Sequence, residues 1–298
     1  MAGLKTIRRR IVSVRNTKQI TRAMKLVSAA KLRRAQDAAL SGRKFSERLA
    51  QIFRVVLREL PDDFSHPLFT TRPEVKRRRV IFVSGERGLC GAYNANVTKA
   101  IQQNEASAPN FSERVDFFPI GKQAITACKR FGWTNAGPEE RLSEDVADWP
   151  AAEIAQMLVD DYIEGKFDEL VVYYTKFVSA MTQEVTREVL LPFSTDALSE
   201  AAEDGVAADH TEYGSPRFDP SPDQILLKLV TVLLASKLRQ AGLEAKASEH
   251  AARMTAMDSA TRNADDLIGQ LRLFYNRARQ SAITRELIDI VGGAEAIK

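Results

Sequence analysis

Apolar side chains recur every three or four positions near the start of this chain, as one face of an α-helix requires. No glycine or proline interrupts residues 4–41. Proline breaks a helix interior and glycine weakens it by about 1 kcal/mol. The pattern therefore predicts a long helical element within residues 1–60. Its stripe runs through Leu4, Ile7, Ile11, Val14, Thr17, Ile20, Met24, Val27 and Ala30.

The same spacing returns in residues 223–298, where no proline occurs and only Gly242 and Gly269 interrupt the run to Val291. The stripe is narrow and rich in small residues, which suits packing against one partner helix better than a globular core. Its positions include Met254, Met257, Thr261, Ala264, Ile268, Leu271, Tyr275, Ala278 and Ala282. The two ends together predict an antiparallel two-helix coiled coil of the N- and C-termini.

The last turns of the second helix carry apolar residues on most sides, at Ile283, Leu287, Ile288, Ile290, Val291 and Ile297. Such a helix end is expected to be enclosed, because large exposed apolar patches mark interaction sites. The pattern leaves two possibilities equally open. The tip either sits in a sleeve formed by other proteins or folds back on its own domain.

Residues 75–195 differ from both ends. Short β-branched and aromatic runs at 80–83, 115–120 and 170–174 alternate with helical patterns, and 184–190 alternates like a further strand. This alternation predicts a Rossmann-like α/β globular domain with a largely parallel sheet. Residues 196–222 are acidic and rich in Ala, Ser, Gly and Pro, which is typical of a surface loop.

Charge is strongly segregated along the chain. Residues 1–58 carry a net charge of +14, residues 59–220 carry −12, and residues 221–298 carry +2. The basic end is therefore expected to meet an acidic partner, which is nucleic acid, an anionic membrane surface or an acidic protein face. We expect no transmembrane helix and no signal peptide, because no apolar run is long enough and Arg8–Arg10 lead into an amphipathic pattern.

One segment lies where an α/β domain binds phosphate or a dinucleotide. Ser84–Asn94 follows a predicted strand and precedes a predicted helix. Its glycines, at positions 85, 88 and 91, match neither the G-x-G-x-x-G fingerprint nor a Walker loop, so a tight turn without a ligand is favoured.

No catalytic, cofactor-binding or metal-binding set is apparent elsewhere. The three histidines are scattered, and Cys90 and Cys128 form neither a disulfide framework nor a metal spacing. We expect Cys90 to be a buried structural residue and not a nucleophile, and reduced thiols favour a cytoplasmic setting. The residues alone leave two functions open: a mechanical or scaffolding coiled-coil subunit, or a basic coiled coil that binds nucleic acid.

Four segments of the sequence distinguish between these two functions. Ile7–Arg34, Arg87–Gly91, Ala251–Met257 and Tyr275–Leu287 closely resemble, in the same order, the gamma subunit of F-type ATP synthases. They lie at both ends and in the middle, so the resemblance covers the whole chain. It implies a coiled coil that stands inside a ring of three alpha and three beta subunits, beside an α/β domain.

The resemblance also implies a function. Such a subunit rotates with the epsilon subunit and the c-ring, and thereby couples proton flow through the membrane sector to ATP synthesis or hydrolysis. It is not itself an enzyme and has no cofactor. It binds no nucleic acid and meets the membrane only indirectly, through the c-ring. The location implied is the cytoplasmic face of the bacterial plasma membrane.

Several residues match positions with known roles in the family. Met24, Lys25 and Arg253 match the neck region near acidic lever segments of beta, and Arg279, Gln280 and Thr284 match residues that contact a beta loop near the top of the ring. Ile283 and Leu287 belong to the apolar tip. Cys90, Phe218 and Asp219 match the foot near epsilon and the c-ring, where some members have tyrosine and glutamate in place of the last two.

Overall fold

The computed structural model describes residues 2–58, 66–70, 72, 74–105, 111–193 and 222–295. Of the expected acidic loop at 196–222, residues 196–221, which include Phe218 and Asp219, lie outside the described residues. Two long helices dominate the chain, α1 (Ala2–Arg58) and α7 (Pro222–Glu295). The fold divides into two compact units. We call Met1–Ala30 with Arg253–Lys298 the helical unit, and Lys31–Ala252 the α/β unit.

In the helical unit the two helices run antiparallel, as predicted. Lys18 pairs with Asp265, Thr21 with Thr261 and Lys25 with Asp258. Residue numbers therefore increase along α1 where they decrease along α7. The seam of α7 includes the predicted positions Met257, Ala264 and Ile268, all of them buried.

The seam of α1 departs from the predicted one after Val14. Ile20 and Val27 were expected to face α7, but they are 60% and 55% exposed, while Thr21 and Ser28 are buried. The spacing that begins at Leu4 continues by strict alternation of three and four residues, which brings the small hydroxyl side chains into the seam. These let the helices approach closely, with the Thr21 and Thr261 hydroxyls 2.8 Å apart. The apolar residues next to them face outward.

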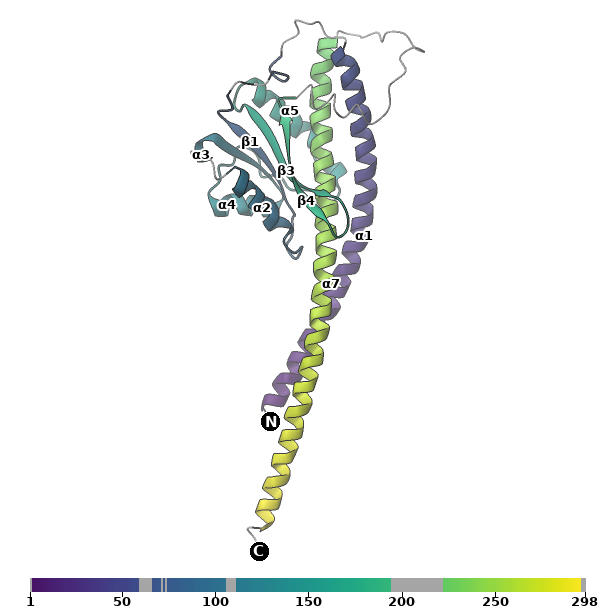
Figure 1. Cartoon of the computed structure of the whole chain (residues 1–298), viewed down its shortest axis with the longest axis vertical. Coiled ribbons are helices and arrows are strands. Elements are labelled where there is room, and N and C mark those ends of the chain that lie inside the picture. Colours follow the sequence, from purple (N-terminus) through teal and green to yellow (C-terminus); the bar gives the residue numbers. More distant parts are fainter. Residues whose placement is uncertain are drawn as a thin grey trace. The chain divides into compact units, whose positions relative to one another are not determined.

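The α/β unit contains a four-stranded sheet, of which Figure 1 labels β1, β3 and β4. The strand order is β2-β1-β3-β4. Its strands are β1 (Arg78–Val83), β2 (Val115–Ile120), β3 (Glu169–Phe177) and β4 (Gln183–Leu191). Strands β1, β2 and β3 are parallel, and β4 joins β3 in the antiparallel sense. The prediction of a largely parallel sheet is thus confirmed, with one antiparallel edge strand.

Helices cover both faces of this sheet, and alternate residues of β1 show it. Val80 and Phe82 pack with residues of α2 (Tyr93–Asn104) and α4 (Lys122–Phe131). Ile81 and Val83 pack in a second core with residues of α5 (Ala151–Ile163), α1 and α7. The sheet is therefore the middle layer of the unit, as both-face burial of parallel strands requires. The short elements are α3 (Phe111–Arg114) and the 3-10 helix η1 (Val146–Asp148).

Candidate interaction surfaces

The outer surface of the helical unit is unusually apolar. On α1 the exposed apolar side chains of this unit are Val12, Ile20, Leu26 and Val27, and on α7 they are Leu267, Leu273, Phe274, Ile283, Leu287, Ile288, Ile290 and Val291. Monomeric proteins rarely expose so many large apolar residues together. This surface is thus suited to contact with another protein. The sequence pattern predicted the apolar tip of α7 as a contact surface. It did not predict that Ile20 and Val27 belong to this surface, because it assigned them to the seam.

The basic residues at the neck are partly compensated within the unit. The Lys25 ammonium lies 2.5 Å from Asp258, and the Lys18 ammonium lies 2.5 Å from Asp265. A hydrogen bond from Lys25 holds the pKa of the Asp258 carboxyl below its usual range. Among the described residues of α1 in this unit, only Lys18 and Lys25 form such ion pairs. The remaining positive charge of α1 in this unit is exposed, on Lys5, Arg8, Arg9, Arg10, Arg15 and Arg22.

The other residues singled out on these helices occupy different environments. Met24 is half-buried and Arg253 is buried, so Arg253 does not present its charge on the surface. Arg279, Gln280 and Thr284 are exposed. The Thr284 hydroxyl donates to the carbonyl oxygen of Gln280 at 3.0 Å, one turn back on the same helix. The guanidinium of Arg279 and the amide of Gln280 are thus presented on one exposed stretch of α7.

Cys90 is buried, as the sequence predicted. Its thiol lies 3.7 Å from the carbonyl oxygen of Arg87, and the Asn94 amide donates to its sulfur at 3.2 Å. Cys128 is buried as well, and burial raises the pKa of its thiol to about 12. A thiol with so high a pKa is almost wholly protonated at neutral pH and therefore a poor nucleophile.

The turn after β1 adjoins α7. The Tyr93 hydroxyl donates to the carbonyl oxygen of Ala245 at 3.0 Å, and the Ser248 hydroxyl donates to that of Thr175 at 2.9 Å. Residues 245–248 of α7 therefore lie at the carboxyl ends of β1 and β3, where open α/β sheets bind their ligands. A helix of the same chain occupies the place at which a dinucleotide would be expected.

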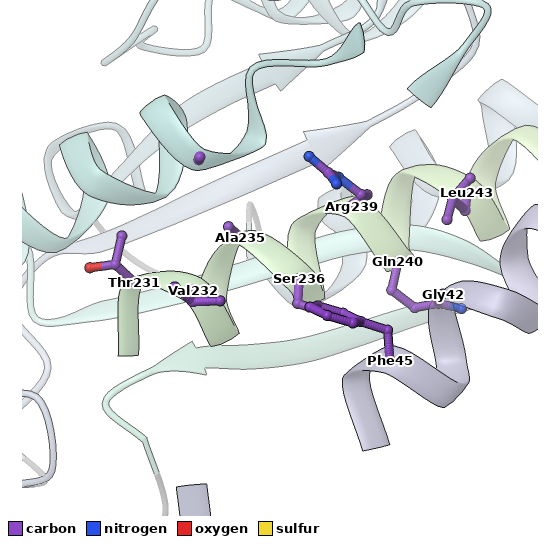
Figure 2. A pocket seen from close by; sticks show the side chains of 10 residues that line it. Gly42, Phe45, Thr231, Val232, Ala235, Ser236, Arg239, Gln240 and Leu243 are labelled. Atoms are coloured by element: carbon purple, nitrogen blue, oxygen red, sulfur yellow. The ribbon is translucent and has the colours of Figure 1, made fainter. Parts of the chain in front are cut away.

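A groove between α1 and α7 in the α/β unit has a volume of about 240 Å³ (Figure 2). Gly42 and Phe45 contribute to it from α1, and Val232, Ala235 and Leu243 from α7. Its mainly apolar lining suits apolar side chains better than a charged cofactor. Among the residues that the structure describes, no three metal-ligating side chains come together. No described helix is long and apolar enough to cross a membrane.

These features define a class of protein. Paired long helices with an apolar outer surface, joined to an α/β layer whose ligand crevice is filled by its own helix, are typical of a structural subunit in a larger assembly. Comparison with known sequences gives the family. A family model described as ATP synthase matches residues 3–297. An ATP synthase gamma chain of Geobacter sp. (strain M21) is 40% identical over 301 residues, with both chains fully covered.

A second relative agrees with the first. An ATP synthase gamma chain of Cytophaga hutchinsonii is 38% identical and covers 100% of this chain and 99% of its own length. The chain therefore belongs to the ATP synthase gamma chain family. The fold is also similar to a chain in the Euglena gracilis mitochondrial ATP synthase structure with OSCP, F1 and c-ring. That match has a TM-score of 0.65 at 19% identity and covers 99% of this chain and 95% of the other.

Proposed function

We propose that the chain is the central rotor subunit of an F-type ATP synthase. The helical unit turns inside a ring of three alpha and three beta subunits, and the α/β unit meets the epsilon subunit and the c-ring. Rotation couples proton flow through the membrane sector to ATP synthesis or hydrolysis on the ring. The observation that carries this proposal is the apolar outer surface of a helix pair that already has its own seam. That surface needs an enclosing partner.

The chain contributes contacts and no bond chemistry, and the nucleotide sites belong to the ring. Different sides of the helix pair favour different conformations of the three beta subunits, which is a population shift through differential contacts. The groups on α1 and α7 are not equivalent. One side offers the outward Ile20 and Val27, and another offers exposed arginines. Such asymmetry is what the mechanism requires.

Named contacts follow from the family resemblance. Met24, Lys25 and Arg253 contribute to the neck that meets the acidic levers of beta. Arg279, Gln280 and Thr284 meet a beta loop, and Ile283 and Leu287 lie in the sleeve. Cys90 supports the turn after β1, which together with Phe218 and Asp219 belongs to the foot near epsilon and the c-ring. The exposure of Arg279, Gln280 and Thr284 supports the second of these contacts.

The location proposed is the cytoplasmic face of a bacterial plasma membrane, where the chain is peripheral and held through the c-ring. Support comes from relatives of nearly full-length similarity in several bacteria, Geobacter and Cytophaga among them.

Assembly with purified alpha and beta subunits tests the function. We expect a complex of fixed stoichiometry that hydrolyses ATP and turns a probe fixed to the α/β unit. The alternative, a basic coiled coil for nucleic acid, predicts salt-sensitive DNA binding by the full chain with no ring assembly. That second result would overturn the rotor proposal.

A further inference from the structure

The carboxyl ends of β1 and β3 lie at the switch point of the sheet. The chain leaves β1 toward β2 on one side, and β3 leads to β4 on the other. Crevices of this kind are ligand sites in open α/β folds. Here α7 fills the position, and the filling segment is Ala245–Glu249, which lies within the α/β unit together with both strands.

The fit at this position is close. Ala245, Ala247, Ser248 and Ala251 are completely buried, and their small side chains let the helix axis approach the strand ends. Gly85, in the turn after β1, faces the Glu249 side chain of α7. A Cβ built there would lie 3.0 Å from the carboxylate carbon of Glu249 and 3.2 Å from the Asn94 side-chain oxygen. Glycine at 85 thus leaves room for the Glu249 carboxylate, itself buried.

Two buried hydrogen bonds tie the helix to different elements. Tyr93 begins α2, and its hydroxyl reaches the Ala245 carbonyl oxygen. Ser248 lies three residues further along α7, and its hydroxyl reaches the Thr175 carbonyl oxygen of β3. Positions three apart lie on one face of a helix. Two anchors on one face, held by two separate elements, oppose rotation of the helix about its own axis as well as sliding along it.

Apolar side chains of α7 also pack against the sheet in the buried core, but the ion pair between these elements is more exposed. Lys237 pairs with Glu188 of β4, and both side chains are about one-third exposed. Exposed ion pairs contribute little and are screened by salt. Directional restraint at the strand ends therefore comes mainly from the two hydroxyl hydrogen bonds and the buried packing around them.

We propose that Ala245–Glu249, Tyr93, Ser248 and Gly85 form a torque-transmitting joint within the α/β unit, at which the sheet layer and the adjoining segment of α7 are locked to turn as one body. The inference rests on the proposed rotor function and names positioning residues for it. Helix α7 fills the crevice at the position where a ligand binds in other open α/β folds. A torque applied to the α/β layer reaches α7 through this joint.

The test uses the full chain assembled with alpha and beta subunits, with the ring fixed to a surface. A rotation probe is attached at one of two introduced cysteines, Met181→Cys on the turn between β3 and β4 or Arg239→Cys on α7. Both native positions are exposed, and both natural cysteines are buried, so labelling is selective. The joint is weakened by combining Tyr93→Phe with Ser248→Ala.

We expect the angular variance of the Met181 probe to rise by about twofold or more, because two buried directional hydrogen bonds are lost. The Arg239 probe should be unchanged. The matched control is Tyr173→Phe, which also removes a buried hydroxyl hydrogen bond, to Glu105 at 2.7 Å, but inside the layer. Unchanged variance at Met181, or equal softening in the control, would overturn the joint and leave the rotor function standing.

A second variant guards against failed assembly of the double variant. Gly85→Ala keeps both hydroxyls but requires the Glu249 and Asn94 side chains to shift by a few tenths of an ångström. We expect it to increase the angular variance of the Met181 probe as well. If the unaltered chain turns neither probe, the rotor function itself is contradicted, and the joint with it. The two failures are thus distinguishable.

Discussion

The Lys25 ammonium and the Asp258 carboxylate lie 2.5 Å apart across the helix seam, although 233 positions separate them in the sequence. Asp258 also lies 3.4 Å from Arg262, one turn further on α7. A carboxylate of the same chain therefore already neutralises the cation assigned to the neck. An acidic side chain of a beta subunit that approaches Lys25 therefore competes with Asp258 for the Lys25 ammonium.

This pair gives the helical unit an acid-sensitive component. The pKa of Asp258 is lowered in the folded chain by the hydrogen bond from Lys25. A depressed carboxyl pKa contributes stability that is present above the unfolded value, about 3.9, and is lost as pH falls through the folded value. We expect Asp258→Asn to flatten the decline in melting temperature between about pH 5 and pH 2. Asp266→Asn, one position after the paired Asp265, is the control. Equal slopes in all three proteins would contradict the role of the pair.

The tip can be tested with two leucines of nearly equal exposure. Leu287 is 57% exposed on α7, and Leu40 is 58% exposed on α1 in the α/β unit. In the isolated chain, Leu287→Glu and Leu40→Glu should each change stability by less than about 0.5 kcal/mol. If the tip is enclosed in the assembled complex as proposed, only Leu287→Glu buries a charge there. We expect it to reduce the yield of active complex by about tenfold or more. Equal tolerance of both changes would count against an enclosed tip.

A buried carboxylate organises the amino ends of the strands. Glu105 is 1% exposed and accepts hydrogen bonds from Tyr173 and Arg78, both at 2.7 Å, with Arg187 3.4 Å away. Burial alone would raise the pKa of Glu105, but these hydrogen bonds outweigh burial and leave its pKa lowered.

Removing this carboxylate should be costly. We expect Glu105→Ala to reduce the free energy of unfolding by about 2–3 kcal/mol, because two arginines lose a buried partner. Glu139→Ala removes an exposed partner of Lys129 and should cost only about 0–1 kcal/mol. Urea unfolding of both variants checks the difference, and similar midpoints would show that the Glu105 network is not stabilising.

Two glycines with positive φ are matched tests of the turn after β2. Gly121 has φ +94°, and a Cβ there would lie 2.3 Å from the Ser84 carbonyl oxygen. Gly132 has φ +66° and open space around it. Gly121→Ala should cost more than about 3 kcal/mol, because strain and a backbone clash add.

Gly132→Ala should cost only about 1 kcal/mol, the penalty of the left-handed conformation alone. Urea unfolding of the full chain measures both changes. If Gly121→Ala were as mild as Gly132→Ala, the close approach of Gly121 to Ser84 would be wrong.

Local pattern was sufficient to predict the helices, the strands and most of the α7 seam. Met257, Ala264 and Ile268 are small or apolar residues at heptad spacing, and nothing else competes for them. The α1 seam was partly wrong because hydrophobicity alone does not say which partner a residue meets. Ile20 and Val27 are as apolar as Ile11 and Val14, yet they face outward, and Thr21 and Ser28 face α7.

The crevice could not be predicted from sequence. Tyr93 and Ala245 are 152 positions apart, and neither belongs to a motif that signals their hydrogen bond. The glycine turn matches no phosphate-binding motif, but its sequence does not explain Gly85, whose proximity to Glu249 depends on a helix that comes much later in the chain. Contacts between residues so far apart in the sequence produce no periodic pattern of side chains that could predict them.

The antiparallel pairing in the helical unit has a consequence for biosynthesis. The first 30 residues leave the ribosome long before Arg253–Lys298, their partner segment. At about 10 residues per second, the N-terminal helix waits roughly 20 seconds or more with its seam uncovered. Closing so long a loop is also entropically unfavourable and slow. The nascent N-terminus is therefore a natural client for chaperones, and pairing of the two ends is a late event in the folding of this chain.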